Sequence, residues 1–220
     1  MLVLGLDTSS PAVSAALVRV ADGGHEVLAE HVVLDGRRHG ELLAQGVREV
    51  LQGARPGAVV VGTGPGPFTG LRVGLMTAAA LSDALQVPAY GVCSLDGLCS
   101  LDGDADCGDV VVVTDARRKE VYSARYGAGE RVEGPAVSRP ADLAGRLVAG
   151  ARLVGAGAVL YRECFAGFDV DEQRLHPSAP TLVARAAARI LAGAPSDPLT
   201  PLYLRRPDAV EPGATKRVSA

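Results

Sequence analysis

The chain has 220 residues, of which 48% are hydrophobic, so it can bury a substantial core in one large domain or two small ones. Its formal net charge of -3 argues against a protein that binds nucleic acid unaided. No apolar run approaches the ~20 residues of a membrane-spanning helix, and no C-x-x-C pair indicates a zinc or thioredoxin-type site. The first residues lack the basic segment of an export signal, so we expect a cytoplasmic protein with reduced thiols.

The first half of the chain predicts a three-stranded meander followed by alternating helices and strands. Short apolar runs between turn residues predict the strands, and proline-free segments with regularly spaced apolar residues predict the helices. The expected strands are residues 2–7, 13–20, 26–34, 58–61 and 89–92, and the expected helices are 40–52 and 71–87.

The second half repeats this opening after an Asp- and Gly-rich stretch at 101–109, which is the best candidate for a boundary. In both halves a buried strand ends in an aspartate, and the interval to the first valine of the next strand is the same. This indicates a duplicated architecture, with chance similarity as the open alternative because the identity is weak. The remaining expected elements are strands at 109–115, 121–126 and 152–154 and helices at 139–148, from 159, and at 181–192.

A loop rich in glycine and proline joins the strand 58–61 to the helix 71–87. It is not a P-loop, because no lysine follows its glycines and because Pro65 and Pro67 have no N–H to donate to a phosphate. We predict a rigid turn that sets the direction of the helix, with Thr69 as its N-cap. The residues to which we assign this structural role are Gly64, Pro65, Gly66, Phe68, Thr69 and Gly70.

The helix 71–87 is apolar around its whole axis, whereas the helix 40–52 has a single apolar stripe. A helix of the first kind is buried on more than one side. Either its own domain covers it completely, or a second protein covers part of it, and the sequence leaves both alternatives open.

The group most typical of an enzyme is Asp7 with the three hydroxyl residues that follow it. These candidates for contact with a nucleotide are Asp7, Thr8, Ser9 and Ser10. The alternative that we favour is that Asp7 and Ser10 bond backbone amides of their own turn. The corresponding hairpin of the second half, residues 115–120, supports it, because charged residues stand where glycines would let a phosphate approach.

Five motifs, in order along the chain, resemble those of the TsaB family, the small actin-like partners of TsaD proteins. The loop at 64–74 is the most specific, because it matches G-P-G-S-F-T-G-L-R-x-G except for Pro67 in place of serine. The other four are L-G-L-D-T-S at 4–9, R-H-G-E-L-L at 38–43, D-A-R-x-x-E-V-Y at 115–122 and P-x-Y-L-R at 201–205.

This resemblance implies an α/β fold of the actin-like (ASKHA) type, in which two duplicated lobes each hold a mixed sheet flanked by helices. On this sequence the lobes are residues 1–103 and 104–220, with a C-terminal segment that could pack back on the first lobe. The resemblance also implies that the chain has no catalytic residue and no metal. Of the His-x-x-x-His pair of TsaD-type relatives only His39 is present, and one histidine cannot hold a catalytic metal.

The resemblance implies a non-catalytic scaffold subunit of the complex that forms N6-threonylcarbamoyladenosine in tRNA. Such a subunit pairs with TsaD and activates it, has TsaE as a further partner, dimerises in isolation and meets tRNA only through the complex. It has no cofactor of its own, since ATP and a metal belong to the complex with TsaD and TsaE. The family's pairing surface corresponds to His39, Leu42, Leu43, Gly46, Val47, Val50, Leu71, Arg72, Leu75, Met76, Ala78, Ala79 and Ser82.

Two other functions remain open on the sequence. The first is an actin-like ATPase or small-molecule kinase that uses Asp7. The second is a glycoprotease-like peptidase, against which the missing second histidine and the absence of a G-x-S-x-G motif argue.

Overall fold

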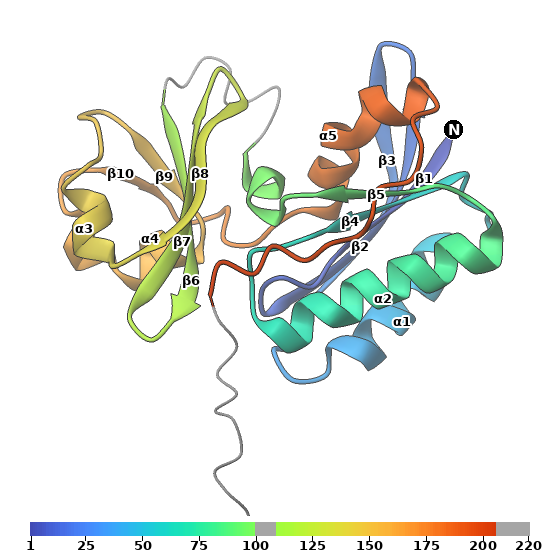
Figure 1. The fold of residues 1–220 in the computed structure, drawn as a ribbon, viewed down its shortest axis with the longest axis horizontal. Helices are drawn as coiled ribbons and strands as arrows, with labels where there is room; N and C mark the ends of the chain where they lie inside the picture. Colours follow the sequence, from blue (N-terminus) through green and yellow to red (C-terminus); the bar gives the residue numbers. More distant parts are fainter. Residues whose placement is uncertain (100–108, 206–220) are drawn as a thin grey trace, which may run out of the picture.

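A computed structural model describes residues 1–99 and 109–205, which form two lobes side by side (Figure 1). Each lobe is built on one five-stranded sheet. The strands of the first sheet are β1 (Leu2–Asp7), β2 (Ala12–Ala21), β3 (Gly24–Leu34), β4 (Ala58–Gly62) and β5 (Ala89–Val92). Those of the second are β6 (Val110–Arg117), β7 (Glu120–Gly127), β8 (Glu130–Ser138), β9 (Arg152–Val154) and β10 (Asp169–Asp171).

The two sheets have the same topology, which confirms the predicted duplication. Their orders are β3-β2-β1-β4-β5 and, read in the same sense, β8-β7-β6-β9-β10. In each sheet three strands form an antiparallel meander, and two further strands then add in parallel. Parallel neighbours need a crossover connection, and helices supply it in both lobes.

Five α-helices and two short 3₁₀ helices lie within the described ranges. They are α1 (His39–Leu51), α2 (Phe68–Leu85), α3 (Pro140–Ala144), α4 (Ala156–Leu160), α5 (Ala179–Leu191), η1 (Ser94–Leu98) and η2 (Arg162–Phe165). Helices α1 and α2 lie together against one face of the first sheet (Figure 1). None of these helices is long and apolar enough to cross a membrane.

Helix α5 covers the opposite face of the first sheet, although it follows the second lobe in the sequence (Figure 1). Its side chains Leu182, Val183 and Ile190 pack with Val3 and Val60 of the sheet. Helices on both faces explain why β4 is buried at every residue and reads as a continuous apolar run. The first lobe is therefore completed by the C-terminal part of the chain.

Several element bounds differ from those expected. Strands β8 and β10 were not predicted, because β8 is an exposed edge strand interrupted by Gly134 and Pro135, and β10 has three residues. The helix expected at 139–148 is only one turn long. The proposed boundary at 101–109 falls, apart from Asp109, outside the described residues, as do residues 206–220 of the tail.

The prediction that Thr69 caps the second helix is wrong. Helix α2 begins at Phe68, and extended Pro67 occupies the N-cap position, where its carbonyl accepts the N–H of Leu71 at 3.0 Å. Pro67 suits this position because its φ is held near −60° and its carbonyl can still open the helix. Phe68, Thr69 and Gly70 therefore belong to the first turn of α2 and not to the loop.

Candidate functional site

The carboxylate of Asp7 is bonded on both oxygens inside the first lobe. Its Oδ1 accepts the backbone N–H of Ser9 at 2.9 Å and the Ser9 hydroxyl at 2.7 Å, and its Oδ2 accepts the Ser94 hydroxyl at 2.7 Å. The side chain is 1% exposed. Burial raises the pKa of Asp7 to about 6, against the opposing effect of the bonds from Ser94 and Ser9. This geometry confirms that Asp7 bonds its own turn.

Ser10 and Thr8 also serve the structure of this region. The Ser10 hydroxyl accepts the N–H of Ala12 at 3.2 Å within the turn. The Thr8 hydroxyl donates to the carbonyl of Gly70 at 2.8 Å and accepts the N–H of Gly74 at 3.1 Å. An ideal helix would join those two groups of α2 to each other, so Thr8 inserts into the helix and ties it to the end of β1.

Two glycines allow the turn at residues 8–10 to pack closely against helix α2 and the loop that precedes it. A Cβ on Gly66 would lie 2.3 Å from the carbonyl oxygen of Ser9, and one on Gly74 would lie 2.5 Å from the Thr8 Oγ1. Any larger residue at these positions would push the loop or the helix away. The glycines of the loop therefore permit close packing between protein segments.

The hairpin between β6 and β7 lies at the corresponding end of the second sheet. Arg117 at the end of β6 and the two turn residues Arg118 and Lys119 all have positive φ, at 63°, 52° and 61°. Such a conformation is unfavourable for non-glycine residues by about 1–2 kcal/mol each. A hairpin built this way presents long cationic side chains, and it lacks the glycines that would let a phosphate reach the backbone.

A cavity of about 220 Å³ lies between the lobes, next to both turns. Proline and leucine provide much of its lining, and the four prolines there are Pro11, Pro65, Pro67 and Pro177. Prolines have no N–H with which to hold phosphate oxygens. Of the predicted nucleotide contacts, Ser9 and Ser10 line this cavity, together with Arg117, whereas Asp7 does not. The arrangement is therefore a poor match to a triphosphate site.

No group of three or more metal-ligating side chains occurs within residues 1–99 and 109–205. His39 stands at the start of α1, and its Nε2 lies 3.0 Å from the carbonyl oxygen of Ser10. The ring therefore holds helix α1 against the turn of the first strand pair.

The residues of the predicted pairing surface separate into two groups. One group is buried within the first lobe, where it contacts the chain's own sheet and neighbouring helix: Leu42, Leu43, Gly46, Val47, Val50, Leu71, Leu75 and Ala78. Leu75 is 5% exposed and belongs to the hydrophobic core. These side chains shape the helix pair and are buried in the isolated chain.

The other group is at least partly accessible to solvent, and its members lie on α2 except for His39 at the start of α1. Arg72, Met76 and Ala79 are exposed, and Met76 has 68% of its surface accessible. His39 and Ser82 are half-buried, and the Ser82 hydroxyl donates to the carbonyl of Val87 at 2.6 Å. Among the described residues, the chain's own domain thus covers one side of α2 and leaves Arg72, Met76 and Ala79 on the other side exposed.

Comparison with known proteins identifies the family. A family model described as TsaD, tRNA N6-adenosine threonylcarbamoyltransferase, matches residues 32–168. The TsaB protein of Bacillus subtilis is 30% identical over 131 residues, 57% of this chain and 55% of that protein. A solved structure of YeaZ from Pseudomonas aeruginosa has a TM-score of 0.75 and 28% identity, covering 92% of this chain and 100% of that one. The chain is a TsaB-like member of the TsaD family.

An uncharacterised protein of Mycobacterium tuberculosis is more similar to this TsaB-like chain in sequence. It is 48% identical over 212 residues, covering 94% of this chain and 93% of that protein. The similarity therefore extends over both lobes.

Sequence reasoning missed two parts of this TsaB-like site. Ser94, which bonds Asp7, lies far along the chain at the start of η1, and nothing around it marks it as a partner. The second part is a stack in which the Tyr203 and Phe68 rings lie 5.0 Å apart and the Arg72 guanidinium lies 4.0 Å from the Phe68 ring. The motifs at 64–74 and 201–205 were both recognised, but their contact was not.

Proposed function

We propose that this chain is the non-catalytic scaffold subunit of the complex that forms N6-threonylcarbamoyladenosine in tRNA. Its homology to TsaB proteins and the TsaD family model support a role in this pathway. In the proposal the chain pairs with TsaD and activates it, while TsaD holds the metal and TsaE joins with ATP. The chain supplies no catalytic residue, dimerises alone and meets tRNA through the complex.

The observation that carries the proposal is the uncovered side of helix α2. Met76 is 68% exposed, and the small residues Ala79 and Ala80 beside it are exposed too. An apolar side chain with small neighbours lets a second helix approach closely. The adjoining helix α1 broadens this surface, because the two helices lie together on the same side of the lobe (Figure 1).

The test is a pairing assay with the TsaD protein of the same organism, by size-exclusion chromatography with light scattering. Met76→Arg and Ala79→Arg place a charge on the exposed side of α2 without touching the core, and we expect pairing at least about tenfold weaker. Val132→Arg is the matched control, because Val132 is 54% exposed on the second lobe. A one-to-one complex retained by both helix variants would overturn the proposed surface.

Activity in the assembled system tests the functional part. With TsaE, ATP and tRNA present, TsaD should modify tRNA faster when the wild-type chain is added, and Met76→Arg should remove most of that gain. Isolated chain should show no ATP turnover that depends on Asp7, because that carboxylate is buried and bonded on both oxygens. Turnover that Asp7→Asn abolishes would favour the ATPase or kinase function instead.

A further inference from the structure

A second cavity lies between the lobes, at the end away from the turns of the candidate site. Its volume is about 350 Å³. Three separate segments line it: β5 with the start of η1, the start of β8, and helix α5. Three arginines, Arg131, Arg185 and Arg189, meet there, and we call this cavity the arginine pocket. Both the first-lobe helix α5 and a second-lobe hairpin therefore contribute cations to one space.

Arg185 is the most buried of the three arginines, and its partners within the described residues are weak. Its side chain is only 8% exposed. One terminal nitrogen donates to the carbonyl of Cys99 at 3.0 Å, and the other lies 3.6 Å from a carboxylate oxygen of Glu130. Glu130 is 80% exposed, so solvent weakens this ion pair. Within the described part of the chain the buried Nε has no hydrogen-bond partner. Asp96 acts on Arg185 through charge without a direct contact, and the Tyr126 ring lies 5.9 Å from its guanidinium. A buried cation whose ion pair is 3.6 Å long therefore keeps hydrogen-bonding capacity for a ligand.

The other two arginines are held in place by the protein. Arg131 Nε lies 3.2 Å from Asp96 Oδ1, and the same oxygen accepts the Tyr126 hydroxyl at 2.7 Å. Arg189 lies 2.6 Å from Asp197 and donates to the carbonyl of Gly91 at 3.0 Å. These bonds fix both guanidinium groups before any ligand arrives. Each guanidinium carries five N–H donors, so donors remain after these contacts.

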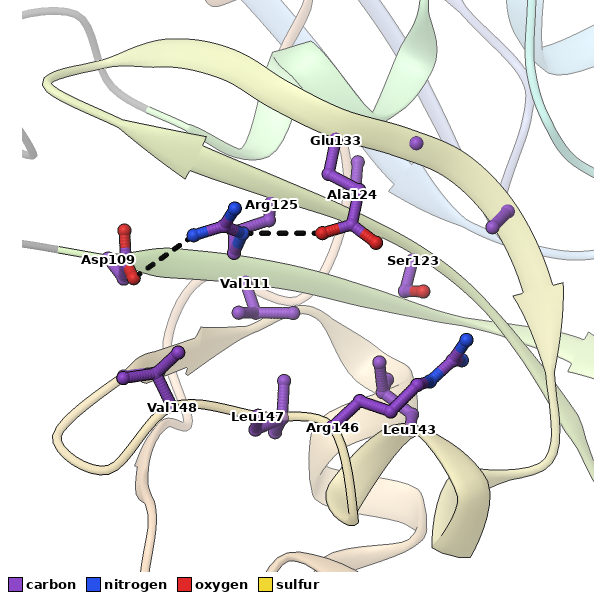
Figure 2. A pocket seen from close by; sticks show the side chains of 13 residues that line it. Asp109, Val111, Ser123, Ala124, Arg125, Glu133, Leu143, Arg146, Leu147 and Val148 are labelled. Carbon is purple, nitrogen blue, oxygen red and sulfur yellow. Dashed lines mark hydrogen bonds and ion pairs between the residues drawn. The ribbon is translucent and has the colours of Figure 1, made fainter.

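A different cavity in the second lobe contains an arginine with two carboxylate partners. There Arg125 lies 3.3 Å from Asp109 and 3.4 Å from Glu133, one carboxylate on either side (Figure 2). Arg125 is also 38% exposed, so water can complete its bonding. The contrast with Arg185 concerns both burial and partners, which makes Arg125 a suitable control.

We propose that the arginine pocket binds a phosphate-type oxyanion, with Arg185 and Arg131 as its principal ligands and Arg189 at the edge. A tetrahedral oxyanion offers acceptor oxygens in several directions, which suits arginines that converge from separate segments, and such charge-assisted bonds are strong. The ligand is either free phosphate or the phosphate group of a nucleotide. Because its ligands come from α5 and from the start of β8, the bound anion links the two lobes. This site is independent of the pairing surface on α2.

The experiment is isothermal titration of the full chain with sodium phosphate at constant ionic strength, with AMP and adenosine as separate arms. We expect saturable phosphate binding that Arg185→Gln weakens by about tenfold or more, since it removes charged hydrogen bonds. Arg125→Gln should leave the affinity unchanged. AMP binding tighter than phosphate, with adenosine inert, would assign the site to a nucleotide phosphate; equal or weaker binding would assign it to free phosphate.

The Glu130→Gln variant should strengthen phosphate binding, whereas Arg185→Gln should weaken it. The Glu130 variant removes the exposed carboxylate that competes for Arg185 and leaves the fold intact, so phosphate should bind more tightly. Circular dichroism of Arg185→Gln identifies a folding defect, in which case the Glu130 variant decides. No saturable binding by the wild-type chain, an effect of Arg125→Gln equal to that of Arg185→Gln, or unchanged or weaker binding by Glu130→Gln would each overturn the proposal.

Discussion

At the scale of single residues, Asp7 shows why an enzyme-like carboxylate need not be catalytic. Ser9 and Ser94 donate hydrogen bonds to its two carboxylate oxygens, and burial raises its pKa to about 6. A carboxylate with this pKa is ionised at neutral pH at a cost in stability, because burial disfavours the charge more than three hydrogen bonds favour it. Its role is to join the end of β1 to the start of η1.

The pH dependence of stability tests this account. The folded-state pKa of Asp7 lies above its unfolded value of 3.8, so the folded chain holds the proton to higher pH. The contribution of Asp7 to stability therefore falls as pH rises from about 4 to about 6, by about 3 kcal/mol in all. Asp7→Asn lacks this loss, so its free energy of unfolding should rise relative to wild type by about that amount between pH 4 and 7. Urea denaturation at several pH values measures it, and parallel curves for the two proteins would contradict it.

Among the secondary-structure elements, helix α2 owes its position to glycines, whose missing side chains allow close packing. Thr8 bonds Gly70 and Gly74 at once, and it can do so only because no Cβ of Gly74 occupies the space 2.5 Å from its hydroxyl. The loop before the helix is tight for the same reason at Gly66. The most specific motif of the chain thus encodes the docking of a helix.

A pair of glycine substitutions separates this packing from helix propensity. Gly74→Ala should destabilise the chain by about 1–3 kcal/mol, because the new methyl group collides with Thr8 in a packed site. Gly40→Ala, in the first turn of α1, meets nothing within 4 Å and should be neutral or stabilising by up to about 1 kcal/mol. Chemical unfolding of both variants gives the comparison. Similar effects of the two substitutions would show that Gly74 has no special packing role.

Neighbouring residues on α2 should respond oppositely to the same substitution. Leu75→Arg buries a charge in the core of the first lobe, so we expect a loss of at least about 3 kcal/mol in stability. Met76→Arg replaces an exposed side chain and should change stability by less than about 0.5 kcal/mol. Thermal unfolding of the isolated variants checks this. Equal stability of the two variants would mean that the helix faces are assigned incorrectly.

At the scale of the whole molecule, the first lobe is not a continuous piece of sequence. Helix α5 reaches back to it, and the N–H of Ala179 donates to the Ser14 hydroxyl at 3.2 Å. Gly5 admits this close approach, since a Cβ there would lie 2.8 Å from the Ala179 carbonyl oxygen. Without α5 the second face of the sheet would expose valines such as Val3, Val18 and Val60.

Fragments of the chain test this dependence. A fragment of residues 1–103 should not unfold cooperatively and should aggregate, because one face of its sheet is uncovered. Joining residues 177–205 to it through a flexible linker should restore a cooperative transition. Circular dichroism and size-exclusion chromatography of both fragments provide the measurements. A cooperative, monomeric fragment 1–103 would show that the first lobe folds without α5.

Local sequence patterns were enough to predict most of the strands and helices, the duplication and the family, but not the edge strands β8 and β10. Local patterns follow from backbone and side-chain preferences alone. Examples are the apolar run at 58–61 and the proline-free segment 71–87. The repeated strand-and-aspartate opening predicted two lobes, and both sheets have the same strand order. The recognition that Asp7 bonds its own turn also rested on a local preference.

Which apolar surfaces are covered, and which distant residues meet, depends on long-range packing that local patterns do not encode. The apolar pattern of α2 is nearly continuous, so its period could not distinguish buried Leu75 from exposed Met76. The amphipathic α5 shows in sequence that one face is buried, but not that the cover is the first sheet. Likewise Arg185 and Arg131 come together only because two lobes pack, and long-range packing leaves no local trace in the sequence.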